Sequence, residues 1–365
     1  MALKVIRVTG LAYLLLATLW LLFNVINSVQ TKRQSSLPSS SSLTSVHAGD
    51  KTTEMPPIDK LIARNGTIIG DISFLLDFAI IAFPKSGTTF MKDYLNSSSE
   101  TWLYEKEFCI KSTKDLQRFV YTYHEMHVKL KQSTHNKQIK FGLKCPGVLY
   151  RNDIQIYRQY FPNAKLLVGL RHPVCWFESF YNYQSWRNVT MPPTTELMGA
   201  CTLHGKVCTD RARFHSALAR LGLTEMDSED EIALLFGSRY NNASNNVIRR
   251  RASQLVRIPN QLFLYEVRQI HDTQVSKELS SDIEQYIQLK QELPEIVSYT
   301  QNKSRSINIC EEEHSKVRKL LVEHGRDAAN WIREYLAKSP NVVVSSTDSF
   351  FSFLNDWSSD PCIGT

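Results

Sequence analysis

Residues 83–90 combine the side chains and turn formers that bind phosphate groups. They read Phe-Pro-Lys-Ser-Gly-Thr-Thr-Phe and follow the apolar residues 78–82, which predict a buried strand. A strand, a tight turn at Gly87 and the first turn of a helix direct backbone N–H groups at an anion, and Lys85 adds a full charge. The lysine precedes the glycine, so the loop departs from the nucleoside-triphosphatase pattern. The residues predicted to bind phosphate are Lys85, Ser86, Gly87, Thr88, Thr89 and Phe90.

A second pattern of the same kind begins at Arg171. The apolar residues 165–170 predict another buried strand, and Pro173 suits the first turn of a helix. Ser179 follows Arg171 by eight residues, about two helical turns into that helix. An arginine at a strand end and a serine on the next helix can hold one phosphate from two sides.

In this order, the two motifs resemble those of sulfotransferases that use 3′-phosphoadenosine 5′-phosphosulfate (PAPS), and most closely the membrane-anchored Golgi carbohydrate (heparan-sulfate-type) branch. The resemblance implies that residues 85–90 bind the 5′-phosphosulfate, and that Arg171 and Ser179 bind the 3′-phosphate. His172 stands where the family more often has Asp or Asn. The basic, glycine-containing loop that closes over the 3′-phosphate in many members is not found, and Arg305 is its nearest substitute.

Sulfuryl transfer to an alcohol requires a base for the acceptor and cations for the leaving group. The segment 102–108 resembles the Lys-Glu segment of the carbohydrate-modifying branch, which implies that Glu107 is the base. Lys144, in a Lys-x-Pro sequence at the end of a short strand, resembles a lysine that neutralises the transferring group. The resemblance therefore implies Lys85, Glu107 and Lys144 as the catalytic set.

Three other residues compete for the role of base. A misalignment of the charged segment would put Glu105 in place of Glu107. The cytosolic branch uses a histidine, and His124 and His127 precede the second motif on a predicted amphipathic helix. These two histidines lie three residues apart, but no third ligand at a supporting spacing accompanies them, so no metal is predicted.

The elements that must position these residues alternate along the chain. Predicted strands at residues 78–82, 141–144, 165–170 and 261–266 are separated by segments that can be helical. An amphipathic helix is predicted from residue 311 to 337, with a break at Gly325. The predicted fold class is α/β, with a P-loop-like, doubly wound, mainly parallel sheet and helices on both faces.

Composition and charge limit the partners. The 365 residues are 42% hydrophobic, enough for one large α/β domain with appendages. The net charge of +7 suits an anionic cofactor and an acidic acceptor, but not nucleic acid, which calls for a denser basic face with interleaved aromatics. The basic residues 249–251 are interpreted as a solvated helix face, with an acceptor cleft as the alternative.

The N-terminal region predicts a membrane anchor. Residues 1–7 form a short cytoplasmic tail, and residues 8–29 form a signal-anchor helix with an apolar stretch long enough to cross a bilayer. Residues 30–57 are Ser-rich and predict a flexible stem, followed by a lumenal domain at residues 58–365. The prediction is a single-pass type II Golgi membrane protein; a signal peptide cleaved near Asn27 is the alternative.

The seven cysteines and the Asn-x-Ser/Thr triplets are consistent with a lumenal domain. A disulfide could close the short loop between Cys201 and Cys208, and Cys310 with Cys362 is a second candidate pair. Cys145 and Cys175 are interpreted as packed small residues, and the odd count leaves a free thiol. The triplets that predict a glycoprotein start at Asn65, Asn96, Asn188, Asn242 and Asn302.

The sequence thus predicts a PAPS-dependent sulfotransferase that acts on a hydroxyl or amine of a glycan or glycoprotein. PAPS is the co-substrate, and no metal is required because fixed cations carry the electrostatic work. The alternatives are a P-loop kinase-like phosphotransferase and a nucleotide- or glycan-binding relative with weak turnover. Sterols and tyrosine peptides remain alternative acceptors, and the oligomeric state is not predicted.

Overall fold

The computed structural model describes residues 55–133, 138–201, 207–222, 257–297 and 305–363 of the chain. The chain divides into two units, Met1–Glu54 and Met55–Thr365, and every described residue belongs to the second. The predicted tail, the predicted membrane span and the predicted stem up to Glu54 lie outside the described residues. Within the described ranges, no helix combines the length and the apolar character that a bilayer crossing needs.

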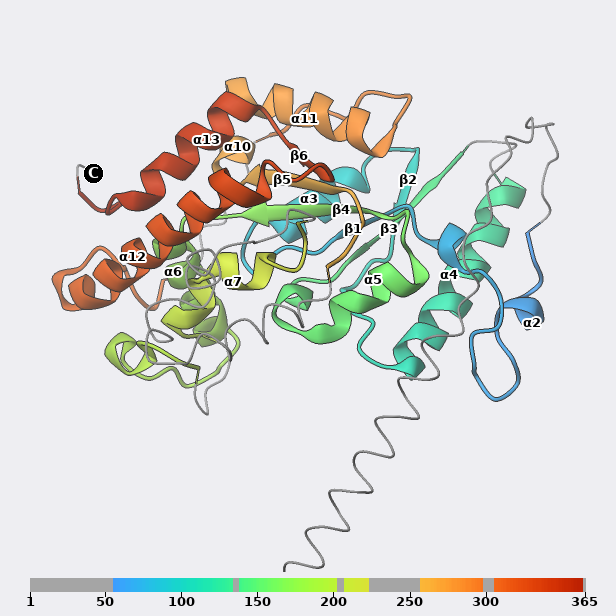
Figure 1. The fold of residues 1–365 in the computed structure, drawn as a ribbon, viewed down its shortest axis with the longest axis horizontal. Coiled ribbons are helices and arrows are strands. Elements are labelled where there is room, and N and C mark those ends of the chain that lie inside the picture. Colours follow the sequence, from blue (N-terminus) through green and yellow to red (C-terminus); the bar gives the residue numbers. More distant parts are fainter. Residues whose placement is uncertain (1–54, 134–137, 202–206, 223–256, 298–304, 364–365) are drawn as a thin grey trace, which may run out of the picture. The chain divides into compact units, whose positions relative to one another are not determined.

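The core of the unit is a sheet of six parallel strands in the order β2-β3-β1-β4-β5-β6 (Figure 1). The predicted α/β class with a parallel, doubly wound sheet is confirmed. The strands are β1 (Phe78–Ile80), β2 (Thr101–Leu103), β3 (Lys140–Lys144), β4 (Lys165–Leu170), β5 (Leu262–Glu266) and β6 (Val342–Val344).

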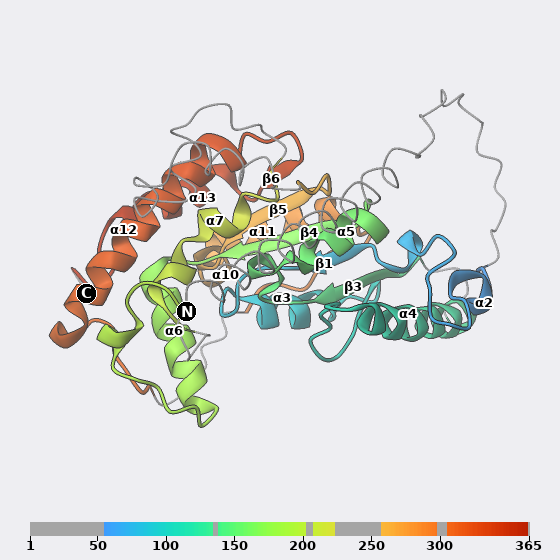
Figure 2. The ribbon, with the colours of Figure 1, turned by 60° about the horizontal axis from the view of Figure 1, so that its bottom comes forward.

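Helices pack around the sheet (Figures 1 and 2). The α-helices of the described residues are α2 (Ile58–Leu61), α3 (Thr88–Leu95), α4 (Thr113–Ser133), α5 (Gln155–Tyr160), α6 (Pro173–Trp186), α7 (Phe214–Leu218), α10 (Arg268–His271), α11 (Thr273–Ile287), α12 (Ser315–Trp331) and α13 (Thr347–Asn355). A π-helical turn follows α12 at Ile332–Leu336. Single 3₁₀ turns lie at Ser73–Leu75, Val148–Tyr150, Asn152–Ile154, Thr194–Leu197, Thr209–Ala212, Glu312–His314 and Asp356–Ser358.

Alternate residues of each strand point to opposite faces of the sheet, and each face has its own core. Phe78 and Ile80 of β1 pack in one hydrophobic cluster with apolar residues of α3 and α11. Ala79, between them, belongs to the cluster that contains apolar residues of α4, α6 and α12. This two-residue period is the geometry of a strand, and burial on both faces explains why the strands read as continuous apolar runs.

The topology brings the predicted site residues to one edge. The chain starts in the middle of the sheet with β1, fills one side with β2 and β3, and then crosses to β4 on the other side of β1. Ligands of such sheets bind at the carboxyl ends of the strands where the order reverses. The predicted phosphate loop follows β1, Lys144 ends β3, and Arg171 follows β4.

Three elements differ from the prediction. The edge strands β2 and β6 were not predicted, because three residues give too short a pattern to distinguish a strand from a loop. The predicted break at Gly325 was wrong: α12 continues through it. A Cβ at this position would lie 2.6 Å from the Trp357 carbonyl oxygen, so the glycine permits close packing of the helix rather than ending it.

Three disulfides join cysteines of the described residues. The predicted pairs Cys201–Cys208 and Cys310–Cys362 are confirmed. The interpretation of Cys145 as a packed small residue was wrong, because Cys145 is bonded to Cys109. Cys175 is a free thiol. Disulfides of this number point to folding in an oxidising compartment.

Candidate active site

The loop between β1 and α3 has the backbone of an anion-binding turn. Lys85 and Gly87 both adopt positive φ values, 69° and 71°. These two left-handed residues turn the chain into α3, and no side chain caps the N-terminus of that helix. The N–H groups of the first helical turn have no intrahelical acceptor, so this end of α3 offers donors and a positive dipole to an anion.

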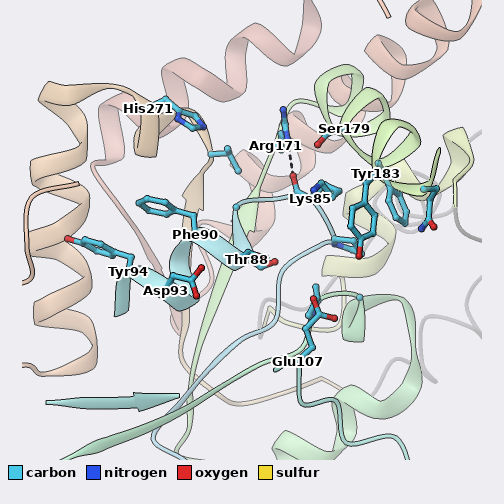
Figure 3. Close-up of a pocket in the computed structure, with 18 of the residues that line it drawn as sticks. Lys85, Thr88, Phe90, Asp93, Tyr94, Glu107, Arg171, Ser179, Tyr183 and His271 are labelled. Carbon is cyan, nitrogen blue, oxygen red and sulfur yellow. Dashed lines mark hydrogen bonds between the residues drawn. The ribbon is translucent and has the colours of Figure 1, made fainter. Parts of the chain in front are cut away.

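The second motif is attached directly to the phosphate loop. Arg171 donates a hydrogen bond of 3.1 Å from Nη1 to the Lys85 carbonyl oxygen, drawn as the dashed line in Figure 3. Trp176, on the first turn of α6, donates one of 2.7 Å from its indole nitrogen to the Pro84 carbonyl oxygen. Two motifs that are about 85 residues apart in the chain therefore form a single structural unit.

One face of α6 continues the site away from Arg171. Ser179 and Tyr183 lie four residues apart on the same side of α6, Arg187 follows as its C-cap, and all three line the cavity described below. The Lys85 ammonium lies 4.6 Å from the centroid of the Tyr183 ring, within the range of a cation–π contact. Tyr183 was missed by the sequence analysis, although the four-residue period from Ser179 points to it.

A cavity of about 980 Å³ opens beside the loop and α6. Glu107 lines it on the side away from His271 and Arg171 (Figure 3). Among the described residues that line it, five carry positive charge and three carry negative charge, so the cavity favours anions. The cations are Lys85, Arg151, Arg171, Arg187 and Arg211, and the carboxylates are Asp93, Glu107 and Glu295.

Aromatic rings form two parts of the wall. Phe90 and Tyr94 of α3 are stacked with ring centroids 5.6 Å apart, and both line the cavity. In another part of the wall, the Arg211 guanidinium lies 4.2 Å from the centroid of Tyr150. His271 of α10, another residue that the sequence analysis missed, also lines the cavity, and burial together with the Arg171 charge lowers its pKa. A wall of aromatic side chains next to cations suits ligands that have planar or sugar-like groups and carry negative charge.

Two predicted catalytic residues form a chain of polar contacts to α3. The Lys144 ammonium lies 3.0 Å from Oε1 of Glu107 and donates a 2.7 Å hydrogen bond to the Thr89 hydroxyl. The Lys144 side chain is only 6% exposed, whereas that of Glu107 is 56% exposed. Glu107 faces the cavity, and Lys144 lies behind it and behind Thr89. The ammonium is therefore placed to act on a bound group through these two side chains.

The competing bases lie elsewhere. Glu105 is exposed, and its backbone carbonyl oxygen accepts a 2.7 Å hydrogen bond from Lys92. His124 approaches the Pro56 carbonyl oxygen at 2.8 Å, and His127 stacks on Phe141 with ring centroids 3.4 Å apart. Neither histidine nor Glu105 is among the residues that line the cavity. The assignment of Glu107 as base remains a prediction, and Glu107 is the candidate that has access to the cavity.

His172 has a structural part in the second motif. Its Nδ1 accepts a 3.2 Å hydrogen bond from the Val174 N–H and so caps the N-terminus of α6. Its Nε2 lies 3.2 Å from the Ser359 carbonyl oxygen, which fits the neutral tautomer with the proton on Nε2. Burial lowers the pKa of His172 to about 4. This ring therefore supplies the capping acceptor that Asp or Asn would supply in other sequences.

The pKa of His172 predicts a pH-dependent stability. The folded protein keeps the ring neutral down to about pH 4, whereas the unfolded chain takes up a proton below about pH 6.5, so stability falls as pH drops through this window. His172→Asn keeps a capping acceptor and removes the titration. We expect the loss of unfolding free energy between pH 7 and pH 5 to shrink by about 2 kcal/mol in urea denaturation.

A matched histidine variant controls this measurement. His124→Asn removes a half-buried ring on α4 outside the second motif and measures how far the loss of another histidine changes the pH dependence. An equal change in both variants, or none in His172→Asn, would show that the buried ring does not titrate as described. His127, whose pKa burial also lowers to about 4, contributes to the dependence that remains.

The acidic end of β5 does not offer ligands to the cavity. Glu266 is fully buried, and its carboxylate accepts hydrogen bonds from the backbone N–H groups of His172 and Arg268. Among the described residues, one cluster brings possible metal ligands within 4.8 Å of one another, Glu311 with Glu313 and His314. None of these four side chains lines the cavity.

The fold and the site together define an α/β protein with an anion-binding loop at the carboxyl edge of a parallel sheet. No protein-family model matches the sequence, and no curated protein matches it. Among solved structures, one described as a sulfotransferase from Alicyclobacillus acidocaldarius aligns over 71% of this chain and 96% of its own, with 12% identity and a TM-score of 0.38. The fold class of this chain is defined by its parallel strand order and by the helices that pack on both faces of the sheet.

Proposed function

We propose that this protein transfers a sulfuryl group from PAPS to a hydroxyl group of a glycan. The observation that carries the proposal is the union of two anion-binding motifs around one cavity. Arg171 reaches the carbonyl oxygen of Lys85, and both residues line the cavity together with Ser179 and Glu107. PAPS carries two separate anionic groups, the 5′-phosphosulfate and the 3′-phosphate, and a site with two anion-binding motifs suits such a ligand.

The residues divide the chemistry between them. PAPS supplies an activated sulfuryl group, so that an acceptor O–S bond forms while the S–O bond to the 5′-phosphate breaks and adenosine 3′,5′-bisphosphate leaves. Glu107 takes the proton of the acceptor hydroxyl. Lys85 and the N-terminus of α3 offset the charge that develops on the leaving phosphate. Lys144 supports this charge from behind Thr89 and holds Glu107 at 3.0 Å.

The cavity wall supports a glycan as acceptor. Tyr150, Phe180 and Tyr183 present aromatic surfaces, on which sugar rings stack through their apolar faces. Arg151, Arg187 and Arg211 give this wall the charge to bind a saccharide that bears carboxylate or sulfate groups. A sterol would need an uncharged wall, and the cations therefore argue for the glycan.

Two observations support a proposal for the cellular location of the protein. The three disulfides require an oxidising compartment, and residues 8–29 have the composition of a signal anchor. We propose a single-pass type II protein of the Golgi membrane with residues 58–365 in the lumen. Protection of the catalytic unit from protease in sealed microsomes, lost on addition of detergent, tests the orientation; cleavage in intact microsomes would exclude it.

Arg171→Ala tests the nucleotide site. Loss of a charged, two-pronged donor to phosphate is expected to weaken calorimetric binding of adenosine 3′,5′-bisphosphate to the full chain by about 50- to 100-fold. Arg171→Lys keeps the positive charge but loses the paired donors of the guanidinium. Its affinity for the bisphosphate is expected to lie between those of the parent chain and of Arg171→Ala. Arg158→Ala, an exposed position on α5 outside the cavity wall, is the matched control and is expected to bind as the parent chain does.

The same measurement separates the alternatives. Tighter binding of ATP–Mg²⁺ than of the bisphosphate would replace the proposal with a kinase-like phosphotransferase. Tight binding of the bisphosphate without transfer from PAPS to chondroitin or desulfated heparin would favour a binding relative with weak turnover or another acceptor. Absence of binding to either nucleotide contradicts the assignment of the cavity.

A further inference from the structure

The disulfide between Cys109 and Cys145 lies beside both residues of the proposed proton-transfer pair. Cys109 follows Glu107 by two residues, and Cys145 follows Lys144 directly. The bond brings the two Cα atoms to 4.9 Å. It therefore ties the segment that carries Glu107 to the strand end that carries Lys144.

The backbone around Glu107 has little regular structure of its own to position it. The pairing of β2 with β3 stops at Leu103, and α4 begins at Thr113. Between them, the Phe108 N–H donates a 3.0 Å hydrogen bond to the Lys144 carbonyl oxygen. The ion pair, this backbone bond and the disulfide join three consecutive residues, 107–109, to the two consecutive residues 144 and 145.

The same disulfide also touches the cavity wall. The Arg151 guanidinium, which lines the cavity, lies with Nη2 3.6 Å from the Cys145 sulfur. Cys145 is almost fully buried, and Phe108 beside Cys109 is part of the hydrophobic core. The bond is thus anchored in the core on both sides, while the carboxylate of Glu107 is more than half exposed to the cavity.

We propose that Cys109 and Cys145 are positioning residues for sulfuryl transfer, whose disulfide holds the Glu107 carboxylate on the Lys144 ammonium and at the cavity wall. The proposal rests on the proposed function, because that function assigns the proton transfer to Glu107. Without the bond, the segment keeps its attachment to the core through Phe108, but the exposed glutamate gains freedom. A general base that moves by about 1 Å can lose about 100-fold in rate, while the nucleotide site, built on the segments between β1 and α3 and between β4 and α6, is unchanged.

The test compares two double variants of the full chain. Cys109→Ala/Cys145→Ala removes the bond at the site, and Cys310→Ala/Cys362→Ala removes a bond outside the cavity wall that closes a longer loop, 52 residues against 36. The control therefore loses at least as much chain constraint in the unfolded state. Transfer from PAPS to chondroitin or desulfated heparin, calorimetric binding of adenosine 3′,5′-bisphosphate and hydrogen exchange of residues 104–112 are measured for each.

For the site variant, we expect kcat to fall by about 10- to 100-fold, with the KM for PAPS and the bisphosphate affinity within about 3-fold of the parent chain. Exchange of the Phe108 amide is expected to rise in the site variant alone. In a Glu107→Gln background, the same cysteine changes should lower kcat little further, because a positioning residue has no effect once its target is gone. If the double variant does not fold, Cys109→Ala, which keeps the buried Cys145, replaces it.

Each of the remaining outcomes contradicts one part of the proposal. Unchanged exchange at residues 104–112 shows that the bond does not hold the segment. Raised exchange with unchanged kcat, or a full further loss of kcat in the Glu107→Gln background, shows that the bond does not act through Glu107. A parent chain that neither binds the bisphosphate nor transfers sulfate refutes the proposed function and with it the catalytic part, while the exchange data still decide whether the bond holds the segment.

Discussion

Lys85→Met is expected to lower kcat for transfer from PAPS by about 1,000-fold, because it removes the full charge nearest to the proposed leaving phosphate. Methionine keeps an unbranched side chain of similar length, so the positive φ at this position is no harder to adopt than for lysine. The Arg171 bond goes to the carbonyl oxygen of residue 85 and is retained. Affinity for adenosine 3′,5′-bisphosphate is therefore expected to fall much less, by about 10-fold.

Lys106→Met is the matched control for the loss of charge. Lys106 is exposed next to Glu107, but it does not line the cavity. Its replacement is expected to change kcat by less than about 2-fold, because solvated surface charges contribute little. Equal losses in both variants would mean that net charge near the cavity, rather than the phosphate loop, sets the rate; an unchanged kcat in Lys85→Met would remove Lys85 from the mechanism.

Glu107→Gln is expected to lower kcat by about 100- to 1,000-fold, the usual range for loss of a positioned general base. The amide keeps the size of the side chain and an oxygen that can accept from Lys144, so the contact at 3.0 Å does not depend on the negative charge alone. The KM for PAPS and the affinity for the bisphosphate are expected to stay within about 3-fold, because the nucleotide motifs lie on other segments, between β1 and α3 and between β4 and α6. Steady-state kinetics at saturating PAPS measures the loss.

The neighbouring glutamate provides the control. Glu105→Gln makes the same chemical change two residues away, at an exposed side chain that does not line the cavity. It is expected to leave kcat within about 2-fold of the parent value. A large loss in Glu105→Gln with none in Glu107→Gln would reverse the assignment, and no loss in either variant would return the search to other groups of the cavity wall.

The parts of the fold that depend on local pattern could be predicted from the sequence. The apolar runs at 78–82, 165–170 and 261–266 correspond to β1, β4 and β5, because strands buried on both faces have no polar interruptions. The parallel, doubly wound class followed from the alternation of these strands with helical segments, whereas the strand order that brings Lys85 and Arg171 to one edge is seen only in the structure.

What depends on contacts between distant segments could not be predicted. Nothing in the residues around Trp176 indicates that its indole donates to the Pro84 carbonyl oxygen across 92 positions of the chain. Cys145 was interpreted as a packed residue because sequence separation gives no preference among pairings, and its bond to Cys109 requires the end of β3 to lie beside the segment after β2. Arg211 and His271 reach the cavity from segments without any motif.

The hydrogen bonds from Arg171 and Trp176 end on main-chain oxygens of the phosphate loop and not on its side chains. Carbonyl oxygens are present whatever side chain is attached, so a substitution of the Lys85 side chain removes its charge and leaves both acceptors of the loop in place. The geometry of the phosphate loop and the charge at position 85 can therefore change independently. On the proposed function, a substitution at position 85 is therefore expected to remove most of the transfer while nucleotide binding is largely kept, because the bonds that shape the loop are retained.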